Sequence, residues 1–297
     1  MVTSAVLQVE HDTHYAYAWP VEQAQHVAFL RPLEDERQQV EAFEMVVEPP
    51  PSHHASGRDV FGNQRVLFSV HSPHAALRVA ARSRVRLVAP AAFDPAATVA
   101  WEAVRDRLVF HAGAPFEPAA EFTAPSPYVP RLAALRELAA EVFTPGRALG
   151  EAAIALMQQV HLDFRYETAS TAVDTPLQQV LVQRRGVCQD FAHLMIGALR
   201  SVGLAARYVS GYLLTTPLPG MAALQGADAS HAWVSVYCPG VPGDWFELDP
   251  TNNLLPSTEH VRLAVGRDYG DVTPLRGVIR GGGRHTLTVR VNTVRLD

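Results

Sequence analysis

Hydrophobic and polar residues alternate along the first ninety positions, which is the pattern of half-buried β-strands. Leu7 and Val9, for example, alternate with the polar residues Gln8 and Glu10. The β-rich runs cover residues 6–10, 14–19, 40–47, 65–70 and 77–88. Because turns containing Gly and Pro separate these short strands, the pattern predicts an antiparallel, sandwich-like β domain.

Further along the chain the apolar spacing changes to that of helices. The stretch 96–130 contains five prolines between positions 112 and 130, so we expect a linker or a segment that wraps the surface. Helical spacing then predicts helices over 131–143, 150–160 and 175–184. From Phe191 the apolar residues follow the i, i+3, i+4, i+7 pattern, which predicts a helix buried along one stripe.

Composition limits the classes of protein to which the chain can belong. It has 297 residues, of which 48% are hydrophobic and 19% charged, and this excludes global disorder. Its net charge of −5 argues against a nucleic-acid binder, which needs a concentrated basic face. No apolar run reaches the roughly 20 residues of a membrane span, and no signal-peptide pattern is seen at the start, so we expect no membrane association. Two cysteines are too few for a disulfide framework, and this predicts a reducing, cytoplasmic location.

These patterns together predict an α+β chain in four parts. They are a β-rich domain over 1–95, the proline-rich segment 96–130, a core over 131–255, and a C-terminal extension with terminal strands over 256–297. The length is enough for about two domains.

Cys188 is placed where a helix begins, directly after Gly186-Val187. Free backbone N–H groups and the positive end of the helix dipole favour a thiolate there, and the same N–H groups suit an oxyanion. A small buried core residue is the competing interpretation of this cysteine.

A base for that thiol is predicted in a hairpin downstream. The runs 231–237 and 245–249 alternate like strands around a Gly- and Pro-rich loop. Paired positions of a hairpin share a constant sum, which is 480 for a loop centred on Gly240, so His231 is expected opposite Asp249 and Trp233 opposite Glu247. The carboxylate would orient the imidazole and favour its charged form.

Other histidines and a metal site are less well supported by the sequence. His193 lies about 140° around the helix from Cys188, so we interpret it as structural or solvent-facing. The pair His53-His54 is interpreted as part of a solvated loop. Cys188, His231 and Asp249 could alternatively ligate zinc, but no CxxC or HxxxH pair anchors such a site, so we expect neither a metal nor a cofactor.

Four segments resemble the bacterial transglutaminase-like proteins. The motifs are 186–194 (GVCQDFAHL), 206–212 (ARYVSGY), 230–234 (SHAWV) and 248–252 (LDPTN), and 59–63 (DVFGN) adds an N-terminal cue. The order Cys, His, Asp matches the papain-like triad of that superfamily. The resemblance implies a papain-like, transglutaminase-like catalytic core preceded by the β-rich domain.

The resemblance also implies roles for individual residues. Cys188 would be the nucleophile, His231 the general base and acid, and Asp249 the group that orients His231. Tyr166 is our candidate for a side chain that assists the oxyanion, or else an aromatic residue that packs beside the cysteine helix. Gln189 and Trp233 are further candidates for oxyanion or substrate contacts, with ordinary core packing as the alternative for Trp233.

The reaction expected from these residues is acyl transfer at an amide bond through a thioester. Water as the second substrate would make the protein an amidase or peptidase, and a primary amine would make it a transglutaminase. The expected partner is a peptide or protein that carries a glutamine, amide or isopeptide bond. A non-catalytic binding or scaffold module that keeps the fold is the alternative.

Overall fold

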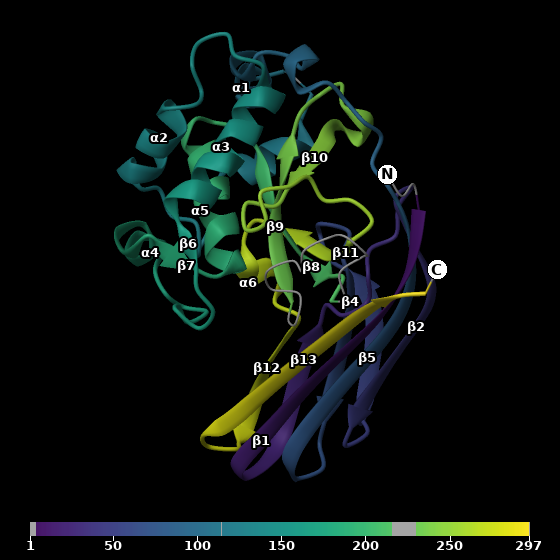
Figure 1. Cartoon of the computed structure of the whole chain (residues 1–297). Coiled ribbons are helices and arrows are strands. Elements are labelled where there is room, and N and C mark those ends of the chain that lie inside the picture. Colours follow the sequence, from purple (N-terminus) through teal and green to yellow (C-terminus); the bar gives the residue numbers. More distant parts are fainter. Residues whose placement is uncertain (1–3, 114, 216–229, 297) are drawn as a thin grey trace.

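The computed structural model of the chain describes residues 4–113, 115–215 and 230–296. It contains two antiparallel sheets and a group of helices (Figure 1). The N-terminal strands are β1 (Ser4–Ala28), β2 (Gln38–Glu48), β3 (His53–Arg58), β4 (Gln64–Val70) and β5 (His74–Val88). The helices are α1 (Trp101–Leu108), α2 (Ala133–Ala140), α3 (Leu149–Asp163), α4 (Leu177–Gln183), α5 (Cys188–Ser201) and α6 (Tyr269–Val272). The remaining strands are β6 (Arg165–Tyr166), β7 (Arg185–Gly186), β8 (Ala206–Leu213), β9 (His231–Tyr237), β10 (Trp245–Leu248), β11 (His260–Gly266), β12 (Leu275–Gly281) and β13 (His285–Arg295).

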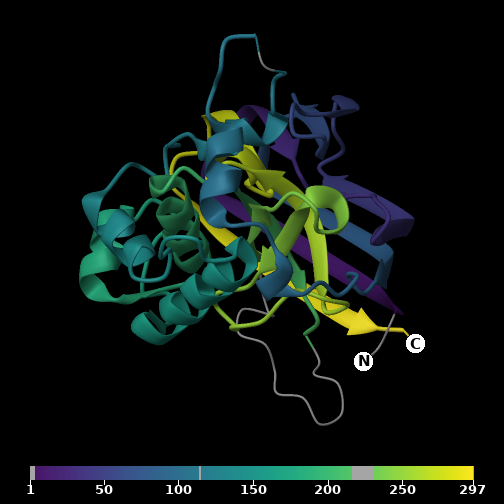
Figure 2. The ribbon, with the colours of Figure 1, turned by 90° about the horizontal axis from the view of Figure 1, so that it is seen from above.

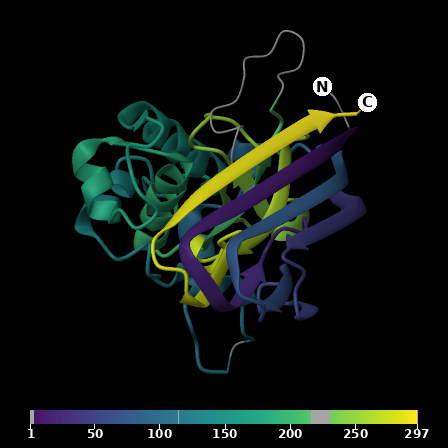
Figure 3. The same ribbon diagram turned by 90° about the horizontal axis from the view of Figure 1, so that it is seen from below.

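The N-terminal sheet is built around β1, which is long enough to serve both halves of the sheet. Residues 7–17 of β1 pair with β13, and residues 21–28 pair with β12. The register against β5 shifts between Ala16 and Val21, where the strand bends. Val21 and Phe68 from one half share a small core with Leu77 and Val79 from the other, so the bent sheet packs on itself as the sandwich-like pattern predicts. Seen from below, β13, β1, β5 and β2 lie side by side (Figure 3).

Three features of this half of the molecule differ from the sequence expectation. His53 and His54 belong to the exposed strand β3 rather than to a loop. The proline-rich stretch contains α1 as well as two short 3₁₀ turns. The C-terminal strands β12 and β13 complete the N-terminal sheet, a long-range pairing that no local pattern indicates.

The second sheet has the strand order β10-β9-β8-β11, and α5 packs against β8 and β9. Viewed from above, the helices gather on one side of this sheet and the N-terminal sheet lies on the other (Figure 2). The predicted helix after Phe191 is confirmed, but α5 is buried on all sides from Asp190 to Arg200 rather than along one stripe. It is therefore the central helix of the group, with Cys188 at its start.

Two amide side chains join the sheets at the free edge of β11. Gln38 Oε1 accepts from the Arg262 N–H at 2.8 Å, and Gln38 Nε2 donates to the Arg262 carbonyl at 2.7 Å. Asn63 repeats this pattern on Val265, with distances of 2.8 and 2.7 Å. Each side chain therefore pairs with this edge as a neighbouring strand would, and at Arg262 the Leu33 N–H also donates to the carbonyl, at 3.0 Å.

Replacing Asn63 by Leu should therefore destabilise the whole chain. The N–H and C=O groups of Val265 would stay buried without partners, at about 1–3 kcal/mol for each group. Urea unfolding should show a lower midpoint. Gln38→Leu should act in the same direction through the Arg262 N–H, while the Arg262 carbonyl keeps its hydrogen bond from the Leu33 N–H. The matched control is Gln39→Ala, since Gln39 is exposed on the same strand as Gln38. Equal midpoints for Asn63→Leu and the control would contradict a bridging role for these amides.

Candidate active site

Cys188 is the first residue of α5, and the residue is partly exposed. Asp190 folds back over the helix start, where its Oδ2 accepts from the Val187 N–H at 2.9 Å and from the Thr171 hydroxyl at 2.6 Å. A Cβ on Gly186 would lie 2.6 Å from that Oδ2 atom, so a glycine is required there. The first N–H groups of a helix have no intrahelical acceptor, and those of Cys188 and Gln189 are the first two of α5.

His231 begins β9, and its hairpin partner β10 ends just before Asp249. The paired positions sum to 482, as for Ser235 and Glu247, and not to the expected 480. Trp233 is therefore diagonal to Glu247 rather than opposite it, yet its Nε1–H still donates to Glu247 Oε2 at 2.8 Å. A shift of two positions keeps every side chain on its face, so the predicted neighbours still meet.

The imidazole of His231 lies between a carboxylate and the thiol. Its Nε2 is 2.9 Å from Asp249 Oδ2, and both side chains are fully buried. The sulfur of Cys188 is 4.0 Å from the carbonyl oxygen of Ser230, the residue before His231. Burial acts to lower the pKa of His231, but the negative charges of Asp249 and Cys188 together raise it to about 10. The ring is therefore an imidazolium at neutral pH.

The carboxylate of Asp249 is saturated with hydrogen-bond donors. Its Oδ1 accepts from the N–H groups of Thr251 and Asn252 at 2.9 and 3.2 Å, in the turn that Pro250 begins. Its Oδ2 accepts from the Asn252 amide at 2.8 Å as well as from His231. Burial by itself would raise the pKa of Asp249, but its two histidine partners, His231 and His260, hold it well below its usual range.

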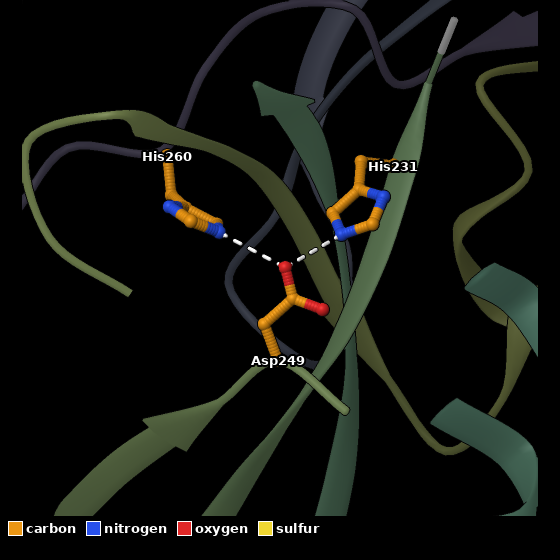
Figure 4. Close-up of side chains that lie close together, drawn as sticks. All are labelled: His231, Asp249 and His260. Atoms are coloured by element: carbon orange, nitrogen blue, oxygen red, sulfur yellow. Dashed lines mark hydrogen bonds and ion pairs between the residues drawn. The ribbon is translucent and has the colours of Figure 1, made fainter. Parts of the chain in front are cut away.

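His260 and Asn252 are members of the site that the sequence did not reveal. His260 Nε2 lies 3.2 Å from Asp249 Oδ2, opposite His231 (Figure 4). Asn252 belongs to a turn to which the sequence assigned no chemistry. His260 is the first residue of β11, two strands away from β9 in the sheet, and no local spacing connects it with Asp249.

Two imidazoles and a carboxylate meet at this site, and all three are possible metal ligands. In the described part of the chain, the possible ligand atoms of His231, Asp249 and His260 lie within 4.8 Å of one another. The carboxylate oxygen lies at hydrogen-bond distance from both imidazoles and also accepts from Asn252. These distances match a carboxylate oxygen that accepts three hydrogen bonds, from His231, His260 and Asn252.

The three further candidate residues lie at different depths. Tyr166 pairs with Gly186 on the strand that leads to Cys188, and its ring lies edge-on to Phe191. The Gln189 side chain donates to the Val173 carbonyl at 3.0 Å. Trp233 is fully buried and stacks on His231 at 6.0 Å between ring centroids, so it supports the imidazole from behind and has no surface for substrate.

Gly211 on β8 makes room for that tryptophan. It pairs with His231, and a Cβ there would lie 2.3 Å from the Trp233 ring. The glycine of the ARYVSGY motif is thus explained by the close approach of the Trp233 ring to β8.

His193 lies in the core, away from the thiol. It is buried, its Nε2 accepts from the Tyr269 N–H at 3.2 Å, and burial together with the Arg200 charge lowers its pKa to about 3. The structural interpretation of His193 is therefore correct and the solvent-facing one is wrong.

Comparisons with known proteins agree with this architecture. Residues 7–86 match the bacterial transglutaminase-like N-terminal region, and residues 136–250 match the transglutaminase-like superfamily. An uncharacterized protein of Mycobacterium tuberculosis is 40% identical over 277 residues, which are 92% of this chain and 87% of that protein. One of Mycobacterium leprae is 33% identical over 98% of this chain and 99% of that protein.

A solved structure shares the whole fold. It is a Cytophaga hutchinsonii protein provisionally described as a cysteine protease, with a TM-score of 0.76 and 21% identity. The match covers 100% of this chain and 92% of that one. Fold, matched regions and relatives agree, and the chain belongs to the transglutaminase-like superfamily, with the N-terminal region of its bacterial members.

Proposed function

We propose that the chain catalyses acyl transfer at an amide bond, with Cys188 as nucleophile, His231 as acid and base, and Asp249 as the group that orients His231. One observation carries this proposal. The Nε2 atom of the buried His231 ring is hydrogen-bonded to Asp249. Its Nδ1 atom has no hydrogen bond within the described residues and is available to the neighbouring Cys188 sulfur. Thiol–imidazole hydrogen bonds of unliganded active sites are often open in this way.

The proposed reaction has two halves. The Cys188 thiolate attacks the amide carbonyl carbon, the C–N bond breaks, and His231 gives its Nδ1 proton to the departing amine. This leaves a thioester on Cys188 and a neutral imidazole. His231 then takes a proton from water or from a primary amine, which attacks the thioester and releases an acid or a new amide together with the thiolate.

The start of α5 supplies the hydrogen-bond donors that would stabilise the oxyanion. The backbone N–H groups of Cys188 and Gln189 belong to the first turn of α5, at its positive end, where an oxyanion gains most from fixed dipoles. Tyr166 is proposed as a second donor, which its pairing beside Gly186 supports. Gln189 contributes its backbone, because its side chain is engaged with Val173.

The proposed substrate is a peptide or protein that carries a glutamine, amide or isopeptide bond. Both cysteines are free, as a thiol enzyme in a reducing compartment such as the cytoplasm requires. No helix in the described ranges is long and apolar enough to cross a membrane.

Incubation with glutamine-containing peptides, with and without a primary amine, tests the proposal. Mass spectrometry distinguishes deamidation by a gain of about one dalton, transfer by the mass of the amine adduct, and proteolysis by fragments. Any of these products, absent with Cys188→Ala, supports acyl transfer. No product from a broad peptide set, together with an unreactive Cys188 thiol, would favour a scaffold role.

A further inference from the structure

We propose that His260 is a positioning residue of the active site, which fixes the catalytic carboxylate through a second imidazole–carboxylate hydrogen bond. The inference rests on the proposed function of Cys188, His231 and Asp249 and adds a fourth residue to that set. Asp249 Oδ2 lies between the Nε2 atoms of His231 and His260, at 2.9 and 3.2 Å (Figure 4).

The surroundings of His260 fix the orientation of its ring. It is buried at the start of β11, and it lies edge-on to Trp233 with 5.2 Å between ring centroids. Trp233 in turn stacks on His231. The indole therefore holds both imidazoles at a set angle to the carboxylate between them.

The two ring nitrogens of His260 have different surroundings. Nε2 lies at hydrogen-bond distance from the carboxylate and donates to it, whereas Nδ1 is buried without a hydrogen-bond partner among the described residues. The polar contact that His260 makes with the site is therefore the hydrogen bond from Nε2 to Asp249.

A hydrogen-bond donor on Oδ2 stabilises the charged form of the carboxylate. The titratable groups that act on Asp249 are His231 and His260, and those that act on His231 are Asp249 and Cys188. Removing the His260 donor makes Asp249 easier to protonate. A protonated Asp249 carries no negative charge to stabilise the His231 imidazolium, and the imidazolium is what stabilises the thiolate. As the pH falls, the variant should therefore lose its reactive thiolate at a higher pH than the wild type does.

Alkylation of Cys188 by iodoacetamide between pH 4 and 9 tests this chain of effects without a known substrate. Labelling is followed by peptide mass spectrometry in buffer with EDTA, because two imidazoles and a carboxylate also bind zinc. His260→Phe keeps the ring but removes the donor. It should slow labelling at neutral pH by about 10–100-fold, as expected for one hydrogen bond to a charged group, and move the acid limb to higher pH.

His260→Gln is the matched variant, because it keeps an N–H donor at similar reach. It should recover most of the wild-type rate and profile, which a merely structural role would not predict. Cys238 is the internal control for folding, since its buried thiol labels quickly only if the variant unfolds. An unchanged profile for a folded His260→Phe variant, or one moved to lower pH, would overturn the inference.

Proton NMR of the wild-type protein tests the inference even if the Phe variant unfolds. Two imidazole N–H signals downfield of the amide region should both disappear in Asp249→Ala. A single such signal, from His231 alone, would overturn the role of His260. Wild-type Cys188 that labels no faster than Cys238 would instead refute the proposed function, so the two failures are distinguishable.

Discussion

Cys188→Ala should reduce product formation from any amide substrate to the background, a loss of about 10⁶-fold if the nucleophile acts as in other covalent acyl-transfer enzymes. In the proposed mechanism the sulfur of Cys188 is the attacking atom, and the Cys238 thiol cannot replace it, because Cys238 is fully buried in the hairpin turn. The loss should be measured by mass spectrometry with the peptide that gives the highest wild-type rate.

The control for this variant is Cys238→Ala, which removes the other thiol and should leave the rate within about twofold. The midpoint of urea unfolding should change little in Cys188→Ala, because Cys188 is partly exposed at a helix start. A Cys188→Ala variant with substantial activity would rule out the thioester route.

Asp249→Asn should lower the rate by about 10⁴-fold while leaving measurable activity. An amide can hold the imidazole only in a different tautomer, and it lacks the charge that stabilises the imidazolium. The same change disturbs the hydrogen bonds that Asp249 receives from Asn252 and His260. The rate should be compared under saturating and limiting substrate.

The pH profile provides a second, independent readout for Asp249→Asn. The wild-type alkaline limb should lie near pH 10, where the His231 imidazolium loses its proton. Burial lowers the pKa of His231, and the Asp249 charge counteracts this effect. Without that charge the pKa of His231 falls, and the alkaline limb should move down by about 1–3 pH units. Asp163→Asn, at a surface pair with Arg184, is the matched control and should not move it. An alkaline limb that stays in place would show that Asp249 does not act on His231.

Local patterns were sufficient to predict the hairpin that carries His231 and leads to Asp249. Alternation placed His231 and Asp249 on one face, and an error of two positions in the register left that face unchanged. A shift of one position would have reversed it. The cysteine helix was predicted from its spacing, although its burial on all sides depends on the helices that surround it.

What the sequence could not show depends on contacts between distant segments. The pairing of β13 with β1, the bridges from Gln38 and Asn63 to β11, and the approach of His260 to Asp249 join positions far apart in the chain. The asparagine of the DVFGN motif, Asn63, is an example, because its side chain hydrogen-bonds to the edge of a strand about 200 residues later in the chain.

The most direct measurement of the central claim is the ratio of iodoacetamide labelling rates at the two thiols of the native protein at pH 7. Burial and the Asp244 charge raise the pKa of Cys238 to about 11, so it carries about 10⁻⁴ thiolate at that pH. Cys188 faces an imidazolium at a helix start and should label at least about 10³-fold faster. Equal and slow labelling of both thiols would contradict the assignment of Cys188 as an activated nucleophile.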